Sequence, residues 1–111
     1  MTTRTSPLTH ARMYAIADFY GVCGLKELAS KKFRDAVGEH WNSDDFAKAI
    51  QVVYTTTIAG DRGLRQVVKE ILMNRMELLD KPDIEAVMRE VPDLAFDVLK
   101  GTRDNLYTRW V

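Results

Sequence analysis

Apolar side chains recur along most of this chain at intervals of three and four residues, which is the spacing of one face of an α-helix. Three such stripes are clear: Leu25, Leu28, Ala29, Phe33, Ala36 and Val37; Phe46, Ala49, Ile50, Val53 and Tyr54; and Leu64, Val67, Val68, Ile71, Leu72, Met76 and Leu79. No segment alternates apolar and polar residues as a half-buried strand does, and the sequence contains no Asn-Gly or Asp-Gly hairpin turn. The sequence therefore predicts an all-α fold, a bundle of about six short helices.

Glycine, proline and capping residues predict the boundaries of these helices. The predicted helices cover residues 9–20, 25–37, 62–79, 82–91 and 92–101, with one more that begins after Asn42 or Ser43 and fades near Thr56. Asp61 is expected to cap the helix that follows it. Gly21, Gly38 and Gly101 are expected to stop the helices before them, and Pro82 and Pro92 suit the first turns of their own helices.

Length and composition limit the classes of protein that fit. The 111 residues are enough for one domain. We expect a flexible segment over 1–8, a helical domain over 9–101, and a tail over 102–111 that is either a last short helix or a segment that docks on a surface. With 46% apolar and 29% charged residues, the chain is neither a disordered tail nor a membrane span. The single cysteine, Cys23, excludes an intramolecular disulfide and favours an intracellular location, cytoplasmic or nuclear.

The residue types that form metal, nucleophile and phosphate sites in other proteins do not form a recognisable site in this sequence. His10 and His40 lie on different predicted elements, and neither has a second His or Cys at helical spacing, so no metal site is predicted. Cys23 precedes a helix, where the thiol pKa can be lowered, but no base or orienting acid can be assigned to it; we interpret it as a half-buried turn residue. The segment 60–63 has two glycines without the Lys-Ser/Thr of a phosphate loop. We therefore predict no catalytic residue, no metal and no cofactor.

Charge patterning gives little support to nucleic-acid binding. Lys+Arg and Asp+Glu both number 16, so the net charge is zero, which excludes a strongly basic domain. The densest basic group, over 26–34, has acids interleaved and resembles an ordinary solvated face. Arg62 and Arg65 stand in a first helical turn, where they oppose the helix dipole, so each is expected to pair with a carboxylate, most simply within this chain. A small helical nucleic-acid-binding domain remains the alternative function.

The first predicted helix is apolar around most of its circumference. Met13, Tyr14, Ile16, Ala17, Phe19 and Tyr20 together cover nearly every direction. Such a helix is buried by later helices, contacts another chain, or lies against a missing neighbouring domain. Met13, Tyr14, Phe19 and Tyr20 are the predicted protein-interaction residues, and Tyr107 and Trp110 of the tail are a second predicted contact. Trp41 is assigned to the core.

A family resemblance explains that helix. The run Ala-Arg-Met-Tyr-Ala-Ile-Ala-Asp-Phe-Tyr-Gly-Val-Cys-Gly-Leu-Lys-Glu-Leu-Ala-Ser-Lys-Lys-Phe over 11–33 resembles the closing helical pair of a BTB/POZ domain. Later blocks are similar to the helical extension that follows this core in BTB proteins of filamentous fungi: His-Trp-Asn-Ser-Asp-Asp-Phe over 40–46, Val-Tyr-Thr-Thr-Thr over 53–57, Asp-Arg-Gly-Leu-Arg over 61–65, Leu-Leu-Asp-Lys-Pro and Val-Pro-Asp-Leu-Ala. The resemblance covers about 11–99.

The resemblance implies an adaptor. It assigns 9–37 to the last BTB helices and 42–101 to the extension, and the strand-rich half and dimerisation helix of a BTB core are absent. The residues by which BTB domains dimerise and dock cullin-3 lie largely in that half, so none carries over. The resemblance implies a protein–protein interaction module or scaffold without catalysis, linked to cullin-dependent ubiquitin ligase assembly through a parent BTB protein. We expect self-association as a homodimer or larger oligomer, or a protein partner, on the apolar surface of 9–37.

Overall fold

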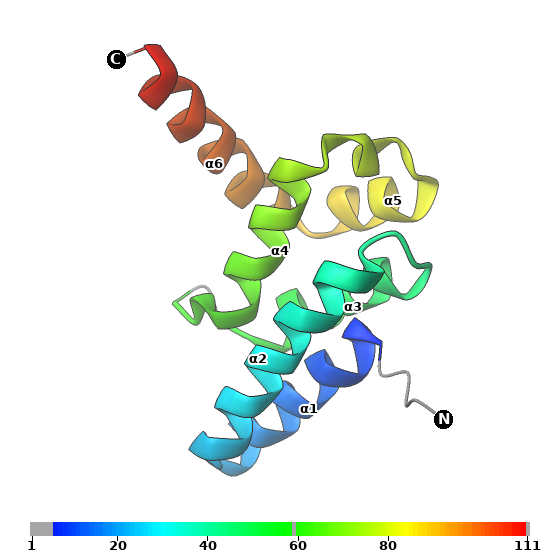
Figure 1. Ribbon diagram of the computed structural model, residues 1–111, viewed down its shortest axis with the longest axis vertical. Coiled ribbons are helices and arrows are strands. Elements are labelled where there is room, and N and C mark those ends of the chain that lie inside the picture. The colour runs from blue at the N-terminus through cyan, green and yellow to red at the C-terminus, as the bar shows by residue number, and fades with distance from the viewer. Residues whose placement is uncertain (1–5, 59, 111) are drawn as a thin grey trace.

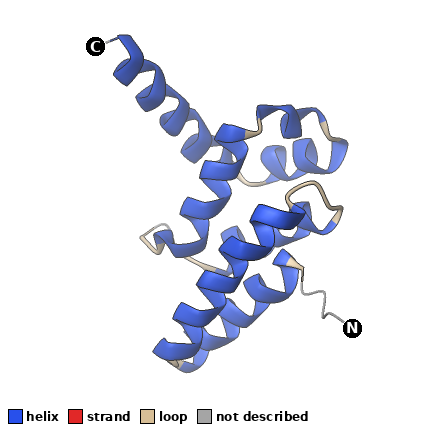
Figure 2. Ribbon diagram, in the orientation of Figure 1, coloured by secondary structure: helices blue, strands red, loops and turns tan. Residues whose placement is uncertain are grey.

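Helices form nearly all of the structure. The computed structural model describes residues 6–58 and 60–110, with side chains given as far as Leu106. Its elements are α1 (Pro7–Tyr20), α2 (Cys23–His40), α3 (Asp45–Thr56), α4 (Arg62–Asn74), the short 3-10 helix η1 (Met76–Asp80), α5 (Pro82–Glu90) and α6 (Pro92–Trp110). No strand occurs in these ranges (Figure 2). The predicted all-α bundle is confirmed.

The first two helices form an antiparallel hairpin that points away from the rest of the bundle. Ser6 caps α1 by accepting a hydrogen bond from the Thr9 amide, and α1 ends at Gly21, whose φ of 70° is the left-handed conformation that glycine adopts without strain. α2 then runs back along α1, and α3 packs against α1 as well (Figure 1). The α1–α2 turn therefore lies at one end of the long axis, and the C-terminal end of α6 lies at the other (Figure 1).

One hydrophobic core joins these elements. α1 contributes the fully buried Pro7, and the other large, fully buried side chains come from the later elements: Phe33, Val37, Phe46, Ile50, Val53, Leu64, Val68, Leu72, Leu78, Ile84 and Leu94. They are mostly members of the stripes read from the sequence, because the helical face that carries them is the face that leaves water. Trp41, assigned to the core, is only half-buried: it packs against the edge of the core, with the Arg75 guanidinium 4.4 Å from its ring centroid.

The predicted helix over 62–79 is wrong over its last five residues, 75–79. α4 ends at Asn74, and the chain turns at Arg75 into η1. The amide of Arg75 still donates to the carbonyl of Ile71, which closes the last turn of α4. After this bend Leu78 is fully buried and the Arg75 side chain reaches Trp41, so tertiary contacts favour the break over a continued helix.

Two of the three predicted glycine stops are also wrong. α2 continues through Gly38 to His40, and α6 continues through Gly101 to Trp110. Gly101 lies where α6 crosses α4: a Cβ there would meet the Met73 sulfur, and Lys69 Cε at 2.7 Å. This glycine therefore serves a close approach of two helices rather than a helix end. The tail over 102–110 is a continuation of α6, which resolves the alternative left open by the sequence.

One of the two predicted helix caps is confirmed, and the other is wrong. Asp61 caps α4 as expected, accepting a hydrogen bond from the Gly63 amide at 3.3 Å. Neither Asn42 nor Ser43 caps α3: the N-cap is Asp44, whose side chain makes no capping hydrogen bond. The Ser43 backbone carbonyl accepts from the Phe46 amide instead, and the buried Ser43 hydroxyl has no partner.

Candidate functional site

Exposed apolar side chains concentrate on the α1–α2 hairpin. Of the eleven large hydrophobic residues exposed in the described part of the chain, six lie between positions 13 and 28. They are Met13, Ile16, Phe19, Tyr20, Val22 and Leu28, and we call them the hairpin surface. Phe19 and Tyr20 are the most open of the six, at 80% and 72% exposed. Two aromatic rings this exposed leave on the order of 300 Å² in water, which is already the size of the largest apolar patch on many monomers.

The geometry of α1 produces this surface. Pro7, Ala11 and Tyr14 follow the helical period on the inner face and are buried. Met13, Ile16 and Tyr20 repeat at the same period on the outer face and are exposed. α2 and α3 cover only the inner face of α1. The described part of the chain therefore leaves the apolar side chains on the outer face of α1 exposed.

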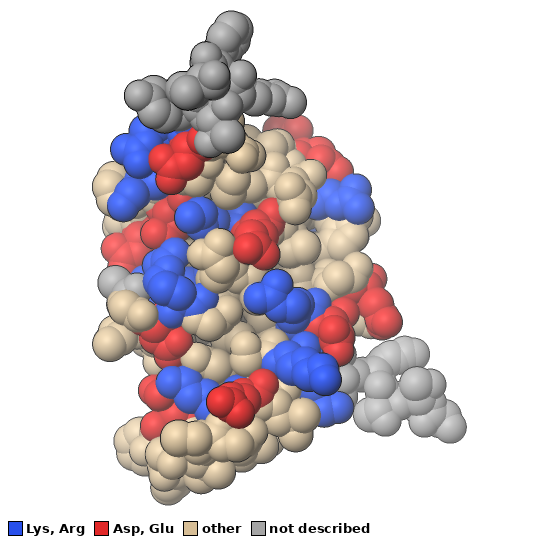
Figure 3. All heavy atoms as spheres, turned by 60° about the vertical axis from the view of Figure 1, so that its left-hand side comes forward, with Lys and Arg blue, Asp and Glu red and all other residues tan. Residues whose placement is uncertain are grey.

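The end of the hairpin has an uncharged face. On the face that Figure 3 shows, the lower end, where the α1–α2 turn lies, is free of Lys, Arg, Asp and Glu. The rings of Phe19 and Tyr20 contact each other edge to face, with centroids 5.0 Å apart. Val22 is exposed beside them, and Cys23 is an exposed free thiol rather than the half-buried turn residue expected. An uncharged aromatic end of this kind is typical of a contact surface.

Tyr14, predicted to be an interaction residue, is a core residue instead. It is 3% exposed, and its hydroxyl donates a hydrogen bond of 2.7 Å to Asp61 Oδ1. The same aspartate forms an ion pair with Lys26 Nζ at 3.3 Å, and Lys26 forms a second ion pair with Asp18 at 2.9 Å. The prediction failed because α1 carries apolar residues on all sides, and only the placement of α2 and α3 decides which side is inner.

This polar cluster is not a reactive one. Burial and the hydrogen bond to Asp61 raise the pKa of Tyr14 to about 12, so its phenol stays protonated. The hydrogen bond to Asp18 raises the pKa of Lys26, so its amine stays charged. A shallow, open depression lies beside them, lined by Tyr14, Lys26, Glu27 and Ser30. None of these shifts prepares a base or a nucleophile near neutral pH.

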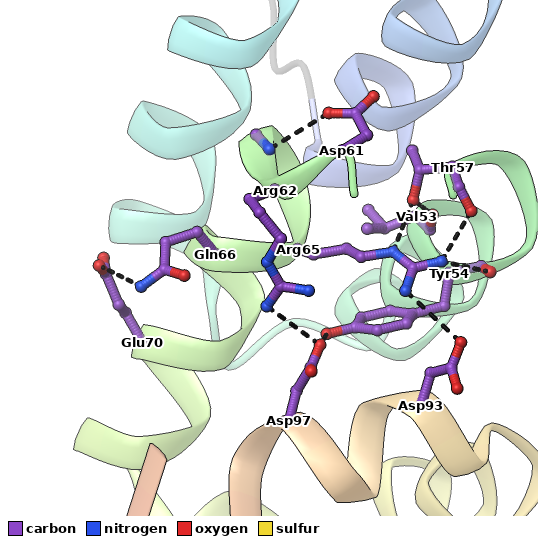
Figure 4. A network of polar contacts seen from close by, with 11 residues as sticks. Val53, Tyr54, Thr57, Asp61, Arg62, Arg65, Gln66, Glu70, Asp93 and Asp97 are labelled. Carbon is purple, nitrogen blue, oxygen red and sulfur yellow. Dashed lines mark hydrogen bonds and ion pairs between the residues drawn. The ribbon is translucent and has the colours of Figure 1, made fainter. Parts of the chain in front are cut away.

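The two arginines of the Asp-Arg-Gly-Leu-Arg segment over 61–65 form their contacts within this chain (Figure 4). Arg62 pairs with Asp97 of α6 at 3.2 Å, and Arg65 pairs with Asp93 at 3.5 Å. Arg65 is 3% exposed, and its guanidinium donates to the Thr57 hydroxyl and to the carbonyls of Thr57 and Tyr54. It also lies 4.5 Å from the Tyr54 ring centroid. The expected internal pairing of both arginines is confirmed, and the segment joins α3, α4 and α6.

The remaining predicted contacts lie at the far end of the molecule. The backbone of Tyr107 and Trp110 is helical, as part of α6, but their side chains lie outside the described residues. Nearby, Phe96, Leu99 and Leu106 are exposed on α6, and none of them was among the contact residues predicted from the sequence. Their spacing of three and seven residues places them on one face of a helix, and this spacing could have identified them. The spacing of Ile16 from Met13 and Tyr20 on α1 could have identified Ile16 in the same way.

The described residues offer no metal site and no membrane-spanning helix. No group of three His, Cys, Asp or Glu side chains in that part of the chain is close enough to hold a metal ion. None of its helices is both long and apolar enough to cross a bilayer. Comparison with known proteins adds no relative, since the chain matches no family model, no curated protein and no solved structure.

Proposed function

We propose that this chain is a protein–protein interaction module that self-associates through the hairpin surface. The observation that carries the proposal is the concentration of six exposed large apolar residues on α1, α2 and the turn between them. A soluble protein rarely leaves such a patch in water, because covering it removes apolar area at about 25 cal/mol per Å². The two exposed rings of Phe19 and Tyr20 form the centre of the contact.

Light scattering across a range of protein concentrations tests this proposal. The wild-type chain is expected to form a dimer or larger oligomer, and Phe19→Lys is expected to be monomeric with an unchanged far-UV helical signal, since the Phe19 side chain lies outside the core. Ile58→Lys is the matched control, because the Ile58 side chain is 75% exposed, close to the 80% of Phe19, but lies outside the hairpin. A wild-type chain that stays monomeric at high concentration, or an equal loss of oligomer in Ile58→Lys, contradicts the proposal.

We also infer that the module derives from the helical part of a BTB/POZ-type protein. Support comes from the residues over 11–33, which form two antiparallel helices joined by a turn at Gly21, the arrangement that the resemblance implies. In this proposal the strand-rich half of a BTB core, or a second copy, covers the hairpin surface, and a parent protein of this type links it to cullin-3 inside the cell. A transcript that encodes such a half upstream of Met1 supports this half as the cover of the hairpin surface, and an in-frame stop codon directly upstream of Met1 excludes it and leaves the second copy.

The proposal includes neither catalysis nor nucleic-acid binding. Many described basic side chains are paired with acids, among them Arg34 with Glu70 and Arg89 with Glu85. Blue and red side chains are interleaved over the face that Figure 3 shows. Fluorescence anisotropy with a labelled DNA duplex separates the alternatives: an interaction module shows no binding, and a nucleic-acid-binding domain shows binding that weakens steeply with salt.

A further inference from the structure

We draw no further inference here: the strongest candidate, the outward face of α6 with the exposed side chains of Phe96, Leu99 and Leu106, carries none because nothing in the described part of the structure shows what covers it.

Discussion

The hydroxyl of Tyr14 donates a hydrogen bond of 2.7 Å to Oδ1 of Asp61, which lies 47 positions further along the chain. Asp61 also caps α4 through the Gly63 amide and pairs through Oδ2 with Lys26 of α2. Burial alone raises the pKa of this carboxyl, but these three partners outweigh it and hold the pKa below its usual value. One carboxylate therefore ties α1, α2 and the start of α4 together.

Tyr14→Phe is expected to lower the free energy of unfolding by about 1–2 kcal/mol, because it removes one hydrogen bond to a charged acceptor and leaves the ring in place. Urea unfolding measures the change. Tyr20→Phe is the control and is expected to have no effect on stability, since Tyr20 is exposed and its ring contacts Phe19. Equal stabilities for wild type and Tyr14→Phe contradict a role for the hydroxyl in the cluster.

Gly63→Ala is expected to destabilise the wild-type chain. A Cβ at this position would lie 2.8 Å from the Tyr14 hydroxyl oxygen, so the hydrogen bond to Asp61 would have to shift. In the Tyr14→Phe background that oxygen is gone, and the same change is expected to be neutral or to stabilise by up to about 1 kcal/mol through helix propensity. Thermal unfolding of the double-mutant cycle measures this coupling. Gly38→Ala is the control, because a Cβ there meets nothing within 4 Å, and it is expected to stabilise α2.

Local signals made much of the fold predictable. The starts of α5 and α6 at Pro82 and Pro92 and the cap at Asp61 depend on residues adjacent in sequence. The break at Arg75 and the passage of α6 through Gly101 depend instead on distant contacts with Trp41 and α4. The spacing of residues along the sequence does not indicate such distant contacts. The end of α4 and the continuation of α6 could therefore not be predicted from it.

The candidate site was predictable to a similar extent. The surplus of apolar residues on α1 was evident in the sequence, and it directed attention to Phe19 and Tyr20, whose rings the structure shows to be exposed. Sorting them from Tyr14 required knowledge of where Asp61 lies, 47 residues away. The exposed apolar residues of α6 were missed because a helix stop was expected at Gly101, which divided Phe96 and Leu99 from Leu106.

Arg65→Gln is expected to cost about 3 kcal/mol of unfolding free energy. The buried guanidinium donates to the buried carbonyl of Tyr54 and to the partly buried carbonyl of Thr57, and its removal leaves both acceptors short of a partner. Asp93→Asn is the comparison: Asp93 is mostly exposed, so losing its ion pair with Arg65 is expected to cost well under about 1 kcal/mol. Chemical denaturation of both variants checks the ranking. If the two changes cost the same, Arg65 acts mainly through Asp93 rather than through the carbonyls.

His10 is expected to make the stability of the chain depend on pH. Burial lowers the pKa of this imidazole in the folded state below 6.5, and the positive charge of Lys32 lowers it further. As the pH falls below about 6.5, the unfolded chain binds a proton that the folded chain does not, so the free energy of unfolding decreases. Urea unfolding between pH 7.5 and 5.5 is expected to show this loss in the wild type and a shallower slope in His10→Gln. An unchanged slope in His10→Gln contradicts the assignment to His10.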